Sequence, residues 1–75
     1  MKIEVLGTGC AKCKTLYDNV KKAVEESGTT AEIIKVEEIL KIMAYGVMST
    51  PALVIDGTVV FSGKTASVGE IKGML

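Results

Sequence analysis

Apolar and polar residues alternate over Lys2–Leu6, so that Ile3 and Val5 share one face. A period of two is typical of a β-strand. Between residues 10 and 27 the period changes, because apolar residues recur every three or four positions with charged residues between them. This spacing predicts an amphipathic helix of about four turns, and Gly28 stands where a C-terminal glycine would end it.

Two further segments repeat these two periods. Ala31–Val36 is short and rich in β-branched residues, which predicts a second strand. Glu37–Tyr45 carries apolar residues at helical spacing and stops before Gly46. The first strand, the long helix and the second strand form a βαβ unit, whose crossover is right-handed with parallel strands in nearly all cases.

A hairpin signal follows in the last third of the chain. Ala52–Ile55 is a continuous apolar run, which predicts a buried strand, and Val59–Phe61 predicts the returning strand. The residues between them include the pair Asp56-Gly57. Asp-Gly between two apolar runs is a strong signal for a tight two-residue turn.

Ser67 and Glu70 have the spacing of a capping box, which predicts a last helix towards the C-terminus. The predicted order is therefore β-α-β-α-β-β-α, with a parallel half first and an antiparallel hairpin after it. This order belongs to the α/β class. Of the 75 residues, 48% are hydrophobic, which suffices for one compact core, and we expect residues 1–75 to form a single domain.

The charged residues narrow the range of partners. Nine lysines balance nine acidic residues, and the chain has neither arginine nor histidine. Without arginine it lacks the planar fork that grips phosphate, which argues against nucleic-acid binding. Without histidine, a Cys–His or Ser–His catalytic pair within one chain is excluded. No apolar run is long enough for a signal peptide or a membrane span, so we expect a cytoplasmic protein with no membrane partner.

The two cysteines, Cys10 and Cys13, stand at the predicted junction between the first strand and the long helix. Gly7 and Gly9 precede them, and we expect both glycines to free the backbone for a sharp turn. Two thiols in this position form either a redox pair or a clip for a soft metal ion. Two cysteines are too few for a secreted disulfide scaffold, which favours a working pair.

A redox pair would divide its roles between the two positions. Unpaired N–H groups and the macrodipole at a helix N-terminus favour a thiolate at Cys10, and such settings lower a thiol pKa from ~8.5 into the range ~3.5–7.5. Cys13 lies one turn deeper on the same face, within reach of disulfide geometry. We therefore expect Cys10 to attack the disulfide of a partner and Cys13 to resolve the mixed disulfide. No cofactor is expected beyond the Cys10–Cys13 disulfide itself.

Three neighbouring residues are expected to modulate the pair. Gly9 precedes Cys10, and Ala11 and Lys12 separate the two cysteines. The ammonium group of Lys12 would stabilise a thiolate and so shift the reduction potential. The alternative is that Lys12 is an ordinary solvated side chain on a first helical turn.

The chain resembles the small thioredoxin- or glutaredoxin-like redox-active disulfide proteins of archaea and bacteria over essentially its whole length. The resemblance depends on the cysteine pair after the first strand, on the order of elements, and on the segment Met-Ser-Thr-Pro-Ala-Leu at residues 48–53. It implies a minimal thioredoxin-like fold, a four-stranded mixed sheet with three helices. It also implies that the bond before Pro51 is cis, that Pro51 faces the cysteines, and that Thr50 offers its backbone to a substrate segment.

For function, the resemblance implies a thiol–disulfide oxidoreductase that works in electron transport and cell redox homeostasis. Its partners would be proteins that contain a disulfide, together with a thiol or flavin reductase. We expect a monomer that holds no metal. The chain departs from the pattern of the family at Gly9, because an aromatic residue often precedes the first cysteine.

Two other functions stay open at this point. The first is a carrier of Cu(I) or a similar soft ion, bound by the two thiolates. Small copper carriers follow the order β-α-β-β-α-β, end in a strand and favour methionine before the first cysteine, whereas this chain has Gly9 there and is predicted to end in a helix. The second is a redox-inert adaptor that uses Thr50 and Pro51 only for binding.

Larger thioredoxins keep a buried carboxylate beneath the second cysteine. In this chain Glu4 is the only acidic residue of the first predicted strand. The alternation of that strand places Glu4 on the face opposite to Ile3 and Val5. We expect Glu4 to face water rather than to take that role.

Overall fold

The structure is a computed structural model that describes residues 1–8 and 11–75. Within these residues the elements follow the predicted order, so the α/β class is confirmed. The strands and the first two helices end within two residues of their predicted limits. The elements are β1 (Lys2–Leu6), α1 (Ala11–Ser27), β2 (Glu32–Val36), α2 (Ile39–Ala44), β3 (Ala52–Ile55), β4 (Thr58–Ser62) and α3 (Val68–Lys72).

The strands of the described ranges form a mixed sheet in the order β2-β1-β3-β4. β1 pairs in parallel with β2, as the βαβ pattern predicts, and places Ile3 opposite Ile33. β3 is antiparallel to both β1 and β4. The hairpin between β3 and β4 turns at Asp56 and Gly57, whose φ angles are 50° and 82°. Positive φ at both residues is the geometry of the tight turns that join twisted strands, which confirms the Asp-Gly prediction.

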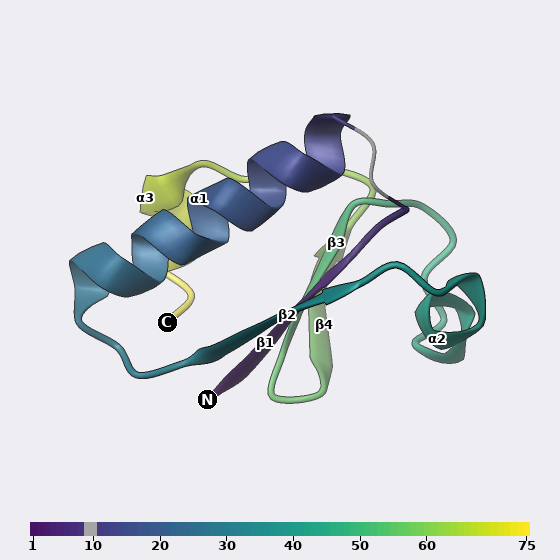
Figure 1. Ribbon diagram of the computed structural model, residues 1–75, viewed down its shortest axis with the longest axis horizontal. Coiled ribbons are helices and arrows are strands. Elements are labelled where there is room, and N and C mark those ends of the chain that lie inside the picture. Colours follow the sequence, from purple (N-terminus) through teal and green to yellow (C-terminus); the bar gives the residue numbers. More distant parts are fainter. Residues whose placement is uncertain (9–10) are drawn as a thin grey trace.

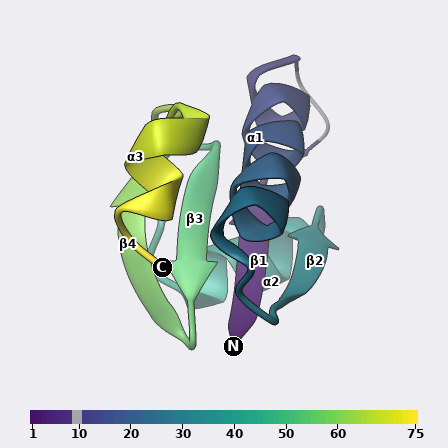
Figure 2. The same cartoon turned by 90° about the vertical axis from the view of Figure 1, so that its left-hand side faces the viewer.

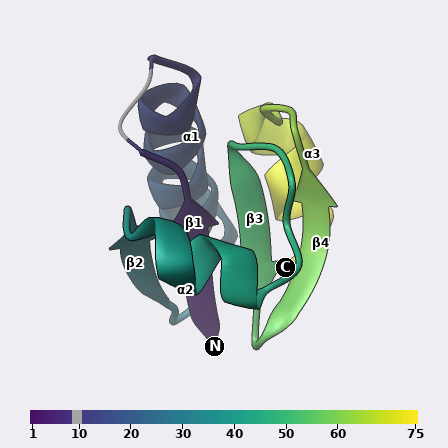
Figure 3. The same cartoon turned by 90° about the vertical axis from the view of Figure 1, so that its right-hand side faces the viewer.

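Helices cover both faces of the sheet (Figure 1). α1 and α3 lie side by side on one face (Figure 2), and α2 lies on the other (Figure 3). The α1–α3 face carries the larger core, to which β1, β3 and both helices contribute side chains that solvent scarcely reaches. These residues are Ile3, Val5, Leu16, Val20, Ala23, Leu53, Ala66 and Ile71.

The α2 face has a smaller core. Its buried residues are Leu6, Val36, Ile42, Val47, Ala52 and Val54. Among the residues of α2 itself only Ile42 is buried, because a helix of six residues has fewer than two turns to lay on the sheet. β1 and β3 send apolar side chains to both faces, as expected for strands in the middle of a sheet.

α1 contacts the sheet through one apolar stripe. The buried residues of the helix are Cys13, Leu16, Val20 and Ala23. Their spacing of three or four keeps them on one face. Asn19 also donates a hydrogen bond from its side-chain amide to the carbonyl of Ala66, at 2.9 Å, which ties α1 to the segment before α3. The packing that fixes the helix therefore also fixes Cys13.

α3 begins with the predicted capping box. The hydroxyl of Ser67 accepts a hydrogen bond from the backbone N–H of Glu70, and the Glu70 carboxylate accepts one from the backbone N–H of Ser67. These bonds satisfy donors that a helix N-terminus otherwise leaves open. None of the helices in the described part of the chain is long and apolar enough to cross a bilayer.

Candidate active site

Two of the predicted site residues, Gly9 and Cys10, lie outside the residues that the structure describes. The residues that follow them are described. Ala11 and Lys12 open α1 and are exposed, whereas Cys13 has only 1% of its surface exposed. Cys13 turns inward because it belongs to the apolar stripe of α1. The second cysteine is thus a buried thiol in the first turn of the helix.

Gly7 follows the last residue of β1 and lies directly against the side chain of Cys13. A β-carbon at Gly7 would fall 2.9 Å from Cβ of Cys13 and closer still to its sulfur. Real β-carbons essentially never come within 3.0 Å of another heavy atom. The φ of Gly7 is outside the positive range, so a left-handed backbone is not the reason for glycine at this position. The position requires glycine because the thiol occupies the space of a side chain.

The backbone of Gly7 is held on the side of β2 as well. Its N–H donates to the carbonyl of Val36 at 2.9 Å, which continues the parallel pairing of β1 and β2 past the end of β1. A β-ladder holds its backbone groups at a fixed spacing. Gly7 is therefore a fixed part of the sheet against which the Cys13 thiol packs.

Pro51 directly precedes β3, the strand that pairs with β1 on the side opposite to β2. The antiparallel pairing of β1 and β3 includes Leu6 opposite Ala52, so the same register continued by one residue places Gly7 opposite Pro51. The peptide bond between Thr50 and Pro51 is cis, the isomer that the resemblance implies. The N-terminal end of α1 and the start of β3 lie at the same end of the sheet (Figures 2 and 3). Gly7, which packs against the Cys13 thiol, and Pro51 therefore follow and precede paired residues at the same end of the sheet.

Thr50 stands at the surface just before the buried Pro51. The carbonyl of Pro51 accepts a hydrogen bond from the N–H of Gly63, at 2.9 Å, so the residue after Thr50 is already paired with the strand beside it. Within residues 1–8 and 11–75 the backbone of Thr50 makes no hydrogen bond. An exposed backbone donor and acceptor of this kind can pair with a visiting peptide.

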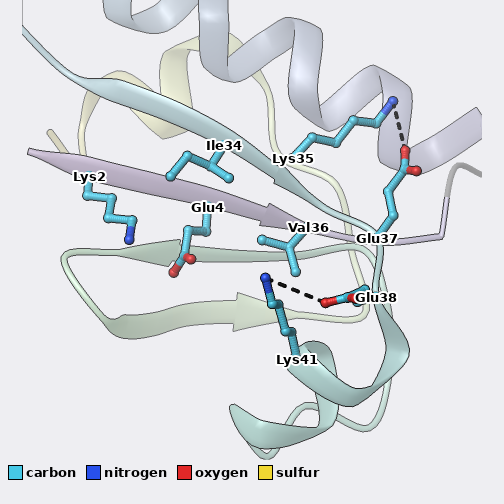
Figure 4. A pocket seen from close by; sticks show the side chains of 8 residues that line it. All are labelled: Lys2, Glu4, Ile34, Lys35, Val36, Glu37, Glu38 and Lys41. Atoms are coloured by element: carbon cyan, nitrogen blue, oxygen red, sulfur yellow. Dashed lines mark ion pairs between the residues drawn. The ribbon is translucent and has the colours of Figure 1, made fainter.

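A hollow of about 370 Å³ lies on the α2 face, away from α1, between β1, β2 and the start of α2 (Figure 4). Its lining residues are Lys2, Glu4, Ile34, Lys35, Val36, Glu37, Glu38 and Lys41. The positive and negative side chains balance, and most are already engaged with each other. Lys35 pairs with Glu37 at 3.4 Å, and a second ion pair joins Lys41 to Glu38 at 3.5 Å. The hollow contains no thiol and lies on the face opposite to Cys13, so it is separate from the cysteine site.

Glu4 faces this hollow and is partly buried. Its carboxylate accepts a hydrogen bond from the hydroxyl of Tyr45, which directly follows α2. That bond, the burial of the hydroxyl and the negative charge of Glu4 raise the pKa of Tyr45 above 10.0. Glu4 is therefore neither beneath Cys13 nor simply in water. The alternation of β1 predicted its face, but no local signal could reveal a partner 41 residues away.

Known proteins match this chain over all or nearly all of its length. A family model described as Thioredoxin domain matches residues 1–75. A protein of Methanocaldococcus jannaschii named Thioredoxin is 51% identical over 70 residues, which are 93% of this chain and 80% of that protein. A second Thioredoxin, from Methanothermobacter thermautotrophicus, is 43% identical over 75 residues, which are 100% of this chain and 97% of that protein. The chain belongs to the thioredoxin family.

This membership confirms the resemblance and the minimal thioredoxin-like fold. Thioredoxins are thiol–disulfide oxidoreductases, and they need no cofactor for that activity. Their partners are, in general, proteins that contain disulfides and a reductase that restores the dithiol.

The alternative of a soft-metal carrier gains no support from these matches. The last element of the described chain is the helix α3, whereas the carriers considered above end in a strand. Across residues 1–8 and 11–75, no three His, Cys, Asp or Glu side chains are grouped so that they could hold a metal ion.

Proposed function

We propose that this thioredoxin exchanges disulfides with partner proteins through Cys10 and Cys13. The observation that carries the proposal is the position of Cys13, a buried thiol in the first turn of α1 that packs against Gly7. A thiol with almost no exposed surface is shielded from the disulfides of other proteins. Because access controls thiol exchange, such a thiol reacts with a bond formed beside it, which is the role of a resolving cysteine.

The exchange takes two steps. The thiolate of Cys10 attacks one sulfur of the partner disulfide, so that a Cys10–partner disulfide forms and the other partner sulfur leaves as a thiolate, which takes up a proton. Cys13 then loses its proton and attacks the sulfur of Cys10. The Cys10–Cys13 disulfide forms and the second partner thiol is released. The partner gains two electrons and two protons. The protein supplies both electrons and the proton of Cys13, and the second proton comes from water, which received it when the Cys10 thiolate formed.

Thr50 and Pro51 are proposed to hold the substrate. Thr50 is an exposed residue, and its backbone makes no hydrogen bond with the described residues. An extended segment of the partner would pair with the backbone N–H and carbonyl of Thr50, just before the start of β3. Leu6 pairs with Ala52, and Gly7 and Pro51 are their neighbours in the chain, which supports the proposal that a segment bound at Thr50 reaches the Cys13 thiol.

Gly9, Ala11 and Lys12 are proposed to modulate the reaction. Lys12 is exposed in the first turn of α1, so its ammonium group is free to adjust towards a thiolate at Cys10. A nearby cation favours the thiolate form and so changes the reduction potential. Gly9 and Ala11 present no large side chain that would block the approach of a partner.

The same chemistry underlies our proposal for the reductase that serves this protein and for its compartment. We propose that a thiol or flavin reductase returns the protein to its dithiol form, and that the protein acts as a monomer in the cytoplasm. There it would serve electron transport and cell redox homeostasis. In a reducing compartment a single close pair of cysteines is catalytic rather than structural.

The test compares Cys10→Ser and Cys13→Ser in the reduction of a peptide that contains one disulfide, with dithiothreitol as the electron donor. Cys10→Ser should lose catalysis altogether. Cys13→Ser should form a mixed disulfide with the peptide that persists long enough to be seen by mass spectrometry. Thr30→Ser, at an exposed position after α1, serves as the control and should behave as the unmodified protein.

Two outcomes would contradict the proposal. If Cys10→Ser trapped the mixed disulfide and Cys13→Ser did not, the two roles would be reversed. If both variants kept the full rate, the pair would not be the site of exchange.

A further inference from the structure

The contact between Gly7 and Cys13 leaves no room for any other residue at position 7. The atom of Cys13 that a β-carbon at Gly7 would meet at 2.9 Å is Cβ, which cannot swing away because it is bonded to the helix backbone. The sulfur lies closer still, and Cα of Cys13 lies at 4.0 Å. The thiol is thus packed against the bare backbone of the sheet.

Neither Gly7 nor Cys13 can easily move away from this contact. On the sheet side, Gly7 is hydrogen-bonded to Val36, and β1 is paired with β2 and β3 along its length. On the helix side, Leu16 and Val20 follow Cys13 on the same stripe and have 0% of their surface exposed. Densely packed cores resist displacement, so the helix cannot lift from the sheet without opening the main core.

From this packing we infer that Gly7 is a positioning residue for the resolving step: its missing side chain sets the place of the Cys13 sulfur. The inference rests on the proposed roles of Cys10 and Cys13. A disulfide tolerates little variation in the separation and direction of its two β-carbons. The backbone of Gly7, against which Cys13 packs, therefore affects how readily the sulfur of Cys13 reaches the sulfur of Cys10.

A side chain at position 7 should act differently on the two redox states. The contact of an added methyl group with Cβ of Cys13 is the same in both redox states, whereas its contact with the Cys13 sulfur changes with rotation about the Cα–Cβ bond. In the disulfide form the sulfur of Cys13 is bonded to Cys10, so this rotation cannot relieve the contact. Gly7→Ala should therefore destabilise the disulfide relative to the dithiol, and it should slow the attack of Cys13 on the mixed disulfide because the attacking sulfur is displaced.

The experiment measures the equilibrium of the protein with oxidised and reduced dithiothreitol, for the unmodified chain and for Gly7→Ala. We expect the equilibrium constant for disulfide formation to fall about tenfold or more, which is the usual scale of overpacking strain. With the peptide disulfide as substrate, Gly7→Ala should also accumulate the mixed disulfide, while alkylation of Cys10 by iodoacetamide stays close to the unmodified rate.

Gly69→Ala is the matched control. Gly69 also has φ outside the positive range, and an added β-carbon there would meet only the Ser67 hydroxyl oxygen, at 4.0 Å. This variant should leave the equilibrium and the lifetime of the mixed disulfide unchanged. A loss of disulfide stability equal to that of Gly7→Ala would show that the effect is a general one of added side chains, and would overturn the inference.

The outcomes separate the inference from the function on which it rests. If the unmodified protein forms no disulfide with oxidised dithiothreitol, the proposed function fails. If it forms one and Gly7→Ala gives the same equilibrium constant, only the positioning role of Gly7 fails.

Should Gly7→Ala not fold, the variant Gly7→Ala/Cys13→Gly decides the matter, because it removes both Cβ and the sulfur of Cys13 from the contact. A folded double variant would support the inference, since the conflict would then lie at the Cys13 side chain. A double variant that failed to fold while Cys13→Gly alone folded would overturn it, since Gly7 would then serve the strand rather than Cys13.

Discussion

The two faces of the sheet are built very differently. On one face, α1 has 17 residues and buries a stripe that runs its length, and α3 packs beside it. On the other face, α2 has six residues and buries Ile42 alone, while Ile39, Leu40 and Met43 are 62%, 82% and 64% exposed. The charged hollow beside α2 leaves this face only partly covered (Figure 4).

The difference shows that the α1–α3 face is the more tightly packed of the two. The cysteine segment opens α1, and Cys13 belongs to the buried stripe of that helix, so the thiol is fixed by the larger of the two cores. The α2 face holds no thiol among the described residues and depends on fewer buried contacts. We therefore expect substitutions on the α1–α3 face to disturb both stability and the cysteine site, and those on the α2 face to cost less.

The largest effect should come from shortening a core side chain on each face. Leu16→Ala removes a side chain with 0% exposure from the centre of α1 and should lower the free energy of unfolding by about 3–4 kcal/mol. Ile42→Ala, at a position that is 5% exposed beside a partly open face, should lower it by about 2 kcal/mol. Urea denaturation measures both, and a larger loss for Ile42→Ala would contradict the comparison.

Ser67→Ala tests the entry to α3 on the more rigid face. It removes the hydroxyl that accepts from the N–H of Glu70 and should cost about 1 kcal/mol of unfolding free energy. Ser62→Ala, at an exposed position in β4, is the control and should change stability by less than about 0.5 kcal/mol. Equal losses in the two variants, measured by thermal and urea denaturation, would show that the capping box contributes nothing.

Tyr45→Phe tests the link between α2 and β1. Loss of the hydrogen bond to Glu4 should lower the free energy of unfolding by about 0.5–1 kcal/mol, because the hydroxyl is only partly shielded from water. Hydrogen exchange should speed up in α2 and stay unchanged in α1. Faster exchange in α1 instead would contradict the separation of the two faces.

The same tyrosine predicts a dependence on pH. The hydroxyl donates only while it is protonated, and its pKa in the folded protein is raised above 10.0 by the bond to Glu4, by burial and by the charge of Glu4. The contribution of the bond is therefore complete below about pH 10 and is lost as the pH rises through the raised pKa. The stability difference between the unmodified protein and Tyr45→Phe should be constant near neutral pH and shrink above about pH 10.

Leu40→Gln should have the smallest effect. Leu40 is 82% exposed on α2, so its side chain gains little from folding, and the change in unfolding free energy should stay below about 0.5 kcal/mol. The rate of disulfide exchange should not change either. A loss of more than 1 kcal/mol would show that the outer side of α2 is packed in solution.

The elements themselves were predictable from neighbouring residues. The alternation in Lys2–Leu6, the helical spacing after Cys10 and the pair Asp56-Gly57 each predicted the element that the structure contains. The capping box at Ser67 also agrees. Signals of this kind act within a few residues, because a turn, a cap or an amphipathic face is set by local backbone geometry and by the spacing of side chains.

The local sequence could not supply the contacts between distant segments. It suggested a turn as the reason for Gly7, whereas packing shows that the Cys13 thiol fills the space beside it. The alternation of β1 predicted which face of the sheet Glu4 occupies, but not that Tyr45 is its hydrogen-bond partner. No local signal specified the strand order β2-β1-β3-β4.

The amino-acid sequence by itself determined which elements form and where in the chain the two cysteines stand. Only the tertiary structure decided that Gly7 lies against Cys13, and that one face of the sheet is deeply packed while the other is partly open. The physical reason is that both outcomes depend on residues from different segments of the chain, which meet only after the helices have been placed on the sheet.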